Sequence, residues 1–367
     1  MVKRIHCFTE SLAGGGAEHQ MAILATLLSE SGYDVTVVTY ADAADHYPLP
    51  EAVKRVRLGQ GKSSFAKLFS IFNYFFRVKT DCVISYRTNP NTRVLLPMLF
   101  RSHKITVICS ERGYTPERAS KFEKINAHLL YNRADHIVTN CNSQRLNLMH
   151  YRKKWCSRLT TIINYTDTDH FITKEFPQDD KIKIGVFGNF SVWKNWERLV
   201  QVVKVLKGQG YDNFAIDWYG NIAGGKSNYE KFIALIKDNE LEDYINVYDA
   251  VKDTSEFMSK YHVICHPSTT EGFSNTISEA LCCGRMLIVG DVSDNSIMAR
   301  PEENGILFNP LDVEDMVKSF EQLLTMPYEA IKAFGKRSRE IAVELFDRDK
   351  FISAYIDLIE GHYGNKE

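Results

Sequence analysis

Short apolar runs alternate along the chain with longer segments in which apolar residues recur every three or four positions. The runs have the length and continuous apolar character of strands that are buried on both faces of a parallel sheet. They cover residues 4–8, 34–40, 81–86, 104–109, 136–140, 181–187, 215–219, 245–248, 262–265, 286–289 and 305–308. The segment 17–31 places its apolar residues at helical spacing and is followed by Gly32, a common helix stop. The alternation of strands and helices predicts an α/β fold.

The same alternation starts twice. A first series begins at residue 4, and a second begins at residue 181 after the polar run 174–180, which contains Pro177. At 367 residues the chain is long enough for two domains with separate hydrophobic cores. The sequence therefore predicts two Rossmann-like domains joined by this polar linker.

Composition narrows the class of protein. A hydrophobic content of 44% and a charged content of 25% are ordinary for a globular protein, and a formal net charge of −1 argues against bulk binding to nucleic acid. The eight cysteines are scattered without metal-ligand spacing, which is typical of small buried side chains. The chain begins with a short strand rather than a signal peptide and has no apolar run of about 18 residues, so we expect a cytoplasmic protein.

Residues 267–291 carry the most informative pattern. A turn-rich loop follows an apolar strand and leads into a helix that we expect to begin near Thr276 and to end before Gly284. Glu271 lies in the loop, and Glu279 lies in the first turns of the helix. Free backbone N–H groups at a helix start bind phosphate, and carboxylates bind ribose or sugar hydroxyls. The structural alternative is that Thr276 and Glu279 only form a capping box.

Residues 271–284 resemble the Glu-x7-Glu pattern of retaining nucleotide-sugar glycosyltransferases of the GT-B architecture, specifically family 4. The matching positions are Glu271, Gly272, Phe273, Asn275, Glu279, Ala280 and Gly284, while Ser274 replaces a glycine. The stretches 14–19 and 164–171 are similar to the glycine-rich loop and the interlobe junction of that family. In the stretch 188–194, Lys194 matches a lysine that holds the donor diphosphate, and Asn189 stands where the family has an arginine.

The resemblance implies two Rossmann-like lobes of GT-B type that face one another, each with a parallel sheet, and a C-terminal helix that crosses back to the first lobe. It implies an acceptor lobe at 1–172, completed by 349–367, and a donor lobe at 173–348. The expected reaction moves a sugar from a nucleoside diphosphate sugar, with a UDP-sugar favoured, to an acceptor hydroxyl with retention at the anomeric carbon. Neither a cofactor nor a metal is implied, because the Asp-x-Asp at Asp167 and Asp169 falls in the junction.

The resemblance also assigns roles to residues. Glu279 would hold the ribose, Glu271 would contact the donor sugar, and Lys194 would stabilise the departing diphosphate. Further donor contacts are expected at Gly15, Gly16, Asn189, Phe273, Ser274, Asn275 and Thr276. The glycines lack the G-x-G-x-x-G spacing of a dinucleotide site, and a flexible turn is the structural alternative for them. Glu111 and Arg112 are expected on the acceptor side, where many family members have a histidine.

The segment 62–79 bears on the acceptor. Its aromatic residues recur at helical spacing, and its only charges are Lys62, Lys67, Arg77 and Lys79. Such a helix can lie on an anionic membrane surface, or it can pack its aromatic face on the sheet. The first reading predicts peripheral contact at the inner face of the membrane and a lipid-linked or growing polysaccharide acceptor in cell-surface polysaccharide synthesis. Two alternatives are a nucleotide-sugar epimerase or hydrolase of the same architecture, and a noncatalytic nucleotide-sugar-binding protein.

Overall fold

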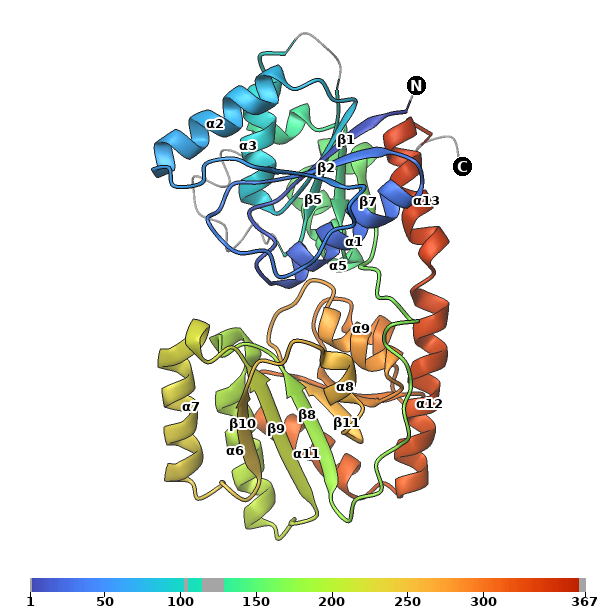
Figure 1. The fold of residues 1–367 in the computed structure, drawn as a ribbon. Coiled ribbons are helices and arrows are strands. Elements are labelled where there is room, and N and C mark those ends of the chain that lie inside the picture. The colour runs from blue at the N-terminus through green and yellow to red at the C-terminus, as the bar shows by residue number, and fades with distance from the viewer. Residues whose placement is uncertain (1, 102–104, 114–128, 363–367) are drawn as a thin grey trace. The chain divides into compact units, whose positions relative to one another are not determined.

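The computed structural model describes residues 2–101, 105–113 and 129–362, and it divides into two compact units (Figure 1). The first unit comprises Met1–Tyr165 together with Arg348–Glu367, and the second comprises Thr166–Asp347. None of the helices in the described ranges is long and apolar enough to span a membrane.

The first unit is built on a parallel sheet of seven strands in the order β3-β2-β1-β4-β5-β6-β7. The strands are β1 (Arg4–Phe8), β2 (Asp34–Thr39), β3 (Lys54–Arg57), β4 (Cys82–Tyr86), β5 (Thr106–Glu111), β6 (His136–Thr139) and β7 (Leu159–Thr161). Strand β1 lies between β2 and β4, so that Ile5 is opposite both Val35 and Cys82. All three of these side chains are buried, because the central strands are covered on both faces.

Helices of the first unit cover this sheet. They are α1 (Gly16–Glu30), α2 (Ser64–Arg77), α3 (Thr88–Met98), α5 (Asn142–Tyr151) and α13 (Arg348–Glu360), with the 3₁₀ turns Tyr131–Arg133 and Lys153–Arg158. The helix expected near the end of the chain is α13, whose Tyr355 lies buried with its hydroxyl 2.8 Å from that of Tyr86 on β4. The segment after residue 347 thus belongs to the core of the first unit.

The second unit repeats the plan with six parallel strands in the order β10-β9-β8-β11-β12-β13. The strands are β8 (Ile182–Phe187), β9 (Phe214–Gly220), β10 (Ile245–Asp249), β11 (Val263–His266), β12 (Met286–Gly290) and β13 (Gly305–Phe308). The helices are α6 (Trp196–Gly208), α7 (Lys226–Asp238), α8 (Thr254–Met258), α9 (Asn275–Cys282), α10 (Asn295–Met298), α11 (Val313–Leu324) and α12 (Tyr328–Leu345), with the 3₁₀ turns Val192–Lys194 and Ala223–Gly225. Trp196, Trp218 and Phe232 pack together in its core. The prediction of two parallel-sheet α/β domains is confirmed.

The change from one unit to the other falls at residue 166, whereas the sequence placed it at residue 173. Residues 166–172 lie with the second unit because Arg339 of α12 donates hydrogen bonds to the carbonyls of Thr168 and Phe171. The same guanidinium binds the carbonyl of Cys282 on α9. Arg339 therefore attaches this segment to the second unit.

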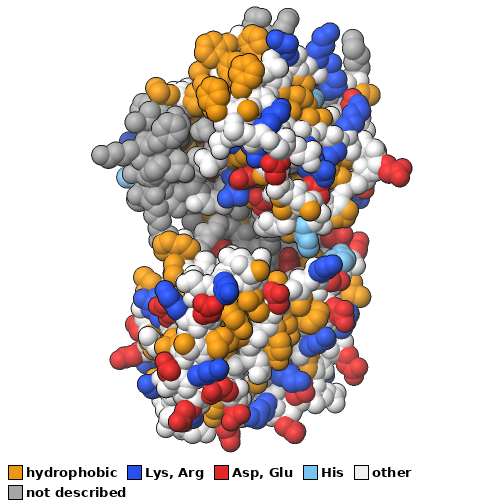
Figure 2. All heavy atoms as spheres, turned by 60° about the vertical axis from the view of Figure 1, so that its left-hand side comes forward, with side chains coloured by type: hydrophobic (Ala, Val, Ile, Leu, Met, Phe, Trp, Pro, Cys, Tyr) orange, Lys and Arg blue, Asp and Glu red, His pale blue; other side chains and the backbone are white. Residues whose placement is uncertain are grey.

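The helix α2 exposes much of its aromatic surface. Ile71 and Phe75 are buried on the sheet, which agrees in part with the core-packing alternative. The exposed side chains of α2 and the end of α3 form what we call the α2 patch: Phe65, Leu68, Phe69, Phe76, Leu99 and Phe100. Figure 2 shows hydrophobic side chains gathered at this end of the molecule with lysine and arginine side chains nearby. One expected cation is not free, because Lys67 forms an ion pair with Asp42 at 3.0 Å.

Each sheet has one position where the direction of the strand order reverses, between β1 and β4 in the first unit and between β8 and β11 in the second. In open α/β sheets, ligands bind outside the carboxyl ends of the strands at this switch point. The fold therefore predicts one ligand site in each unit, at the β1–β4 and β8–β11 switch points.

Candidate active site

At the switch point of the second unit, three ionisable side chains meet. The 3₁₀ turn after β8 ends at Lys194, whose Nζ lies 2.6 Å from Oε1 of Glu271 in the loop after β11. His266 is the last residue of β11, and its Nε2 lies 2.8 Å from the same carboxylate oxygen. The structure thus brings together two separately expected site residues, Lys194 and Glu271, and adds His266, which was not expected.

The charges of this cluster follow from its surroundings. Burial alone would raise the pKa of the Glu271 carboxyl, but the nearby Lys194 ammonium and His266 ring outweigh it and hold the pKa well below its usual range. Burial, together with the Lys194 charge, lowers the pKa of His266. We therefore assign an ionised Glu271, a charged Lys194 and a neutral His266 that donates Nε2–H to the carboxylate.

Asn195 fixes the backbone that carries Lys194. Its φ of 62° lies in the left-handed region, which asparagine tolerates better than most residues. The buried side-chain amide donates to the carbonyls of Pro267 and Pro310 at 3.1 and 2.7 Å. In addition, the amide of Thr269 donates to the Trp193 carbonyl at 2.9 Å. The loops after β8, β11 and β13 are therefore tied together around the lysine.

Helix α9 begins beside the cluster, but not with the capping box that the sequence allowed. Ser274 is the N-cap, and its hydroxyl accepts from the Ile277 amide and lies 3.2 Å from Nε2 of His266. The Glu279 carboxylate instead accepts a 2.8 Å hydrogen bond from the Thr254 hydroxyl of α8. Burial raises the pKa of Glu279 to about 7, and Asp253 adds to this effect against the hydrogen bond from Thr254. The capping-box alternative is wrong, because the cap lies two residues earlier.

The other residues of the second unit that were expected to contact the donor differ in how far they are buried. Phe273 is buried and packs edge-on to Phe346, so its ring belongs to the core of the second unit. Asn275 is partly exposed at the start of α9, and the Thr276 hydroxyl donates to the Phe187 carbonyl at 3.3 Å. Asn189 is exposed, and its side-chain oxygen accepts from the Ser191 amide. Lys194 lies beside the start of α9, because its Nζ is 3.5 Å from Nε2 of His266, which in turn lies 3.2 Å from the Ser274 hydroxyl.

In the first unit, the glycine-rich loop precedes α1. Gly14 and Gly15 have φ of 128° and 133°, and Gly16 begins the helix. The φ of Gly15 is one that residues with a Cβ rarely adopt, so this position favours glycine, and a Cβ there would also lie 2.5 Å from Oε2 of Glu18. The buried Glu18 forms an ion pair with Arg87 at 3.0 Å. The Glu18 carboxylate thus lies between the glycine-rich loop and Arg87.

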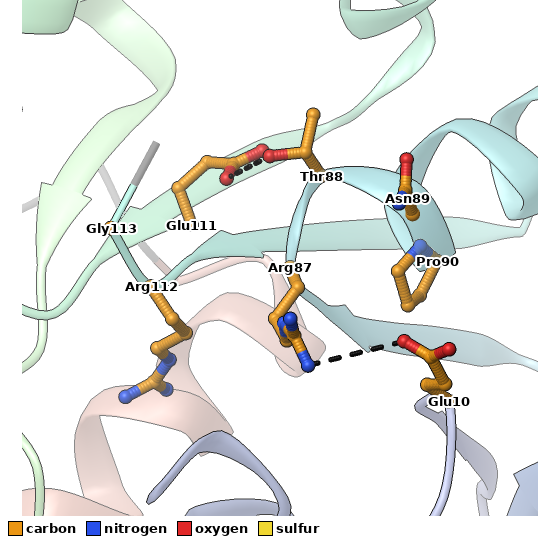
Figure 3. Close-up of a pocket in the computed structure, with 8 residues that line it drawn as sticks. All are labelled: Glu10, Arg87, Thr88, Asn89, Pro90, Glu111, Arg112 and Gly113. Carbon is orange, nitrogen blue, oxygen red and sulfur yellow. Dashed lines mark hydrogen bonds and ion pairs between the residues drawn. The ribbon is translucent and has the colours of Figure 1, made fainter. Parts of the chain in front are cut away.

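A cavity of about 230 Å³ lies at the switch point of the first unit (Figure 3). Its lining consists of Glu10, Arg87, Thr88, Asn89, Pro90, Glu111, Arg112 and Gly113. Both residues that the sequence placed on the acceptor side, Glu111 and Arg112, are among them. Glu111 is buried and accepts hydrogen bonds from Thr88, Asn91 and Tyr131. Arg87 was not foreseen.

Asp167, the first acid of the Asp-x-Asp, serves a turn in the structure. Asp167 uses one carboxylate oxygen to accept from the backbone amides of Asp169 and His170, which is a turn role. In the described part of the chain, no three His, Cys, Asp or Glu side chains are grouped so that they could hold a metal ion.

Comparisons with known proteins agree with the resemblance in the sequence. The family model for glycosyl transferases group 1 matches residues 167–341, and the model for Glycosyltransferase Family 4 matches residues 14–170. An uncharacterized glycosyltransferase of Haemophilus influenzae is 21% identical and aligns over 89% of this chain and 92% of its own. The N-acetylgalactosamine-N,N'-diacetylbacillosaminyl-diphospho-undecaprenol 4-alpha-N-acetylgalactosaminyltransferase of Campylobacter jejuni is 23% identical over 95% and 97%. The solved structure of HepE from Anabaena in complex with UDP and glucose shares the fold with a TM-score of 0.81, at 16% identity and over 98% and 100% of the two chains.

Proposed function

Because this chain belongs to the glycosyltransferases of the family 4 type, we propose that it moves a sugar from a nucleoside diphosphate sugar to an acceptor hydroxyl with retention at the anomeric carbon. The proposed acceptor is a lipid-linked or growing polysaccharide glycan. The observation that carries this proposal is the cluster of Lys194, Glu271 and His266 beside the start of α9.

The cluster supports binding of a diphosphate that leaves with negative charge. Lys194 supplies a cation, and the first turn of α9 adds backbone donors at the positive end of a helix dipole. A diphosphate that reaches Lys194 takes the place of Glu271 as its partner. Glu271 is then free to face the donor sugar, where an ionised carboxylate supports positive charge at the reacting carbon.

Glu279 is proposed to hold the ribose of the donor. Its carboxylate has one hydrogen-bond donor, the Thr254 hydroxyl, among the residues that the structure describes. A second lone pair is thus available for a ribose hydroxyl. The raised pKa fits this role because a ribose hydroxyl would satisfy an acid that the protein alone leaves poorly solvated.

The first unit is proposed to bind the acceptor in the cavity lined by Glu111 and Arg112. The relative from Campylobacter jejuni is named for an acceptor on diphospho-undecaprenol, a lipid carrier. The α2 patch offers aromatic side chains to a bilayer, which supports a lipid-linked acceptor and action at the inner face of the membrane. We propose a UDP-sugar as donor, which HepE supports by the UDP in its solved structure.

A panel of nucleotide sugars, read by thermal unfolding, tests the donor. A true donor at 100 times its dissociation constant stabilises the folded state by about 2.7 kcal/mol. Labelled transfer to lipid-linked glycans is then measured for the wild-type protein, for Glu271→Gln and for Asp180→Asn. Asp180 is exposed just before the amino end of β8, and its replacement removes the same charge and serves as the control for a general charge effect.

The expected result is transfer that persists in excess chelator and collapses in Glu271→Gln alone. Activity that is lost with chelator and restored by magnesium would overturn metal independence. Nucleotide sugar turned over without an acceptor would indicate a hydrolase or epimerase, and binding without any turnover would indicate a noncatalytic binding protein.

A further inference from the structure

We propose that the cavity at the β1–β4 switch point binds an anionic group of the acceptor, a phosphate or a carboxylate, through Arg87 and Arg112. The inference rests on the proposed function, in which the first unit takes the acceptor. It adds the chemical class of that acceptor and two residues that recognise it.

Arg112 is held rigidly by neutral groups. Its guanidinium lies 3.9 Å from the centre of the Tyr86 ring, and its Nε donates to the Ser110 hydroxyl at 3.0 Å. The two terminal nitrogens donate to the Asn164 side-chain oxygen and, at 2.9 Å, to the Tyr355 hydroxyl. Three of the five N–H groups of the guanidinium are used in this way, and the other two have no partner among the residues that the structure describes.

Within the described ranges, no carboxylate forms an ion pair with Arg112. Glu111, the next residue in the chain, accepts its hydrogen bonds from Thr88, Asn91 and Tyr131. A cation that is fixed in place, lines a cavity and has only neutral partners is suited to a ligand that brings its own negative charge.

Arg87 reaches the same cavity at the expense of backbone strain. Its φ of 78° and ψ of 151° lie outside the regions that a residue with a Cβ normally adopts. The conformation is maintained by the Arg87 amide, which donates to the Ser110 carbonyl at 2.9 Å. Strain of this kind is retained where the surrounding structure imposes it, often at ligand sites.

The Arg87 guanidinium is only partly occupied. Nη1 contacts Glu18 at 3.0 Å and lies 3.9 Å from Glu10, while half of the side chain is exposed. Figure 3 shows the side chains of Arg87 and Arg112 leaving adjacent strand ends, with the Arg87 guanidinium turned toward Glu10 and the Arg112 guanidinium extending away from that pair. Both arginines line the same cavity and can contact one extended ligand, and Glu10 is placed to accept from a sugar hydroxyl of that ligand.

The cavity can bind an anion although its lining contains as many acidic as basic side chains. Two arginines and two glutamates line the cavity. One of the acids, Glu111, is 1% exposed and accepts internal hydrogen bonds, whereas each guanidinium has N–H donors with no partner among the described residues. The accessible side of the cavity thus offers more donors for an anion than acceptors.

Equilibrium binding of three related sugars tests the proposal. The probes are methyl α-glucoside, which is neutral, methyl α-glucuronide, which carries a carboxylate, and α-glucose 1-phosphate. The measurements use Lys194→Gln protein without donor, so that the site in the second unit contributes little to binding of anions. Arg112→Gln and Arg87→Gln are compared with Arg4→Gln, which removes the same charge at the opposite, amino end of β1.

We expect at least one anionic sugar to bind roughly 10- to 100-fold more tightly than the neutral sugar, as is typical of charge-assisted hydrogen bonds. Arg112→Gln and Arg87→Gln should abolish this preference, and Arg4→Gln should keep it. The anion that is preferred distinguishes a diphosphate carrier from an acidic sugar. If Arg112→Gln unfolds, Arg112→Lys tests the same point, because it keeps the charge but loses the planar donor set and should lower the preference by about tenfold.

Equal binding of the three sugars, no binding of either anion, or a preference that survives in both arginine variants would each show that the proposal is wrong. Because these measurements need no donor, they remain decisive if transfer itself is never observed. In that case the proposed function fails, and the anion site stands on its own result.

Discussion

The Nζ atom of Lys194 lies 2.6 Å from Oε1 of Glu271, although the two residues belong to different loops of the second unit. The pair keeps a buried carboxylate ionised and an ammonium group in a fixed position. In the proposed reaction each partner is required separately, the cation by the diphosphate and the carboxylate by the sugar. In that proposal, the ion pair holds both side chains in place before the donor binds, and donor binding separates them.

Lys194→Gln should lower the catalytic efficiency of transfer by roughly 10²- to 10³-fold, because one preorganised positive charge is lost at the leaving group. The variant should also be less stable, since Glu271 remains recessed without its cation. The double variant Lys194→Gln/Glu271→Gln should recover stability but not activity. Urea unfolding and initial transfer rates measure the two effects, and a fully active Lys194→Gln protein would contradict the assignment.

Stability should depend on pH through the same pair. The pKa of Glu271 is depressed in the folded state, so its contribution to stability is present above its ordinary pKa of 4.5 and is lost as the pH falls below that value. Unfolding free energies at pH 7 and at pH 3.5 should differ less in Glu271→Gln than in the wild-type protein. Equal differences in the two proteins would show that the ion pair does not stabilise the fold.

Glu279→Gln should increase stability and weaken donor binding. The folded-state pKa of about 7 exceeds the ordinary value of 4.5, so the wild-type protein loses stability as the pH rises between these values. The loss is at most about 3 kcal/mol above pH 7. The variant should therefore gain stability at pH 8 and little at pH 4.5, while nucleotide-sugar affinity falls. A variant that is less stable at both pH values would contradict this origin of the raised pKa.

Asn195 should act as a positioning residue. Asn195→Ala removes the hydrogen bonds to the Pro267 and Pro310 carbonyls and also strains the left-handed backbone. Asn195→Gly removes only the hydrogen bonds, so it should be about 1–2 kcal/mol more stable than the alanine variant. Both should lower kcat through a misplaced Lys194 while nucleotide binding changes less. Wild-type kcat in the glycine variant would exclude this role.

The α2 patch should bind anionic vesicles in a salt-dependent manner. Replacing Lys62, Arg77 and Lys79 by glutamine should reduce partitioning roughly 100-fold at low salt, because each exposed cation contributes about 1 kcal/mol. Lys67 is omitted because Asp42 already neutralises it. The control replaces three exposed lysines of α7 in the second unit, Lys226, Lys231 and Lys237. Wild-type protein that does not sediment with anionic vesicles would remove the membrane role.

The central strands could be predicted from the sequence because burial on both faces makes them continuously apolar. The edge strand β3 was not predicted, since its sequence KRVR is charged and its residues are exposed or half-buried. The edge strand β7 has only three residues and was also missed. Strand prediction therefore failed at the edges of the first sheet, where the apolar signal is weakest.

Sequence motifs predicted which residues lie at the candidate site better than they predicted the contacts of those residues. Two separate motifs placed Lys194 and Glu271 at one donor site, but neither contains their ion pair. Thr276 and Glu279 satisfied the spacing of a capping box that the fold does not form. Glu279 instead bonds Thr254, a contact between α8 and α9 that no local pattern contains. His266 was missed because the apolar run ends one residue earlier, at Cys265.

Tyr355 of α13 forms hydrogen bonds with both Tyr86 and Arg112. The first unit therefore needs a segment that is synthesised after the whole second unit. The ribosome makes residue 355 only after all of the second unit, residues 166–347, has been made. The unit that is later in the chain is therefore the first to have all of its parts, while the first unit still lacks α13 and the contacts of Tyr355. The nascent first unit must be protected from aggregation during that interval. Removing or obstructing the segment 348–360 should then harm the acceptor cavity, although that cavity is lined by residues 10–113.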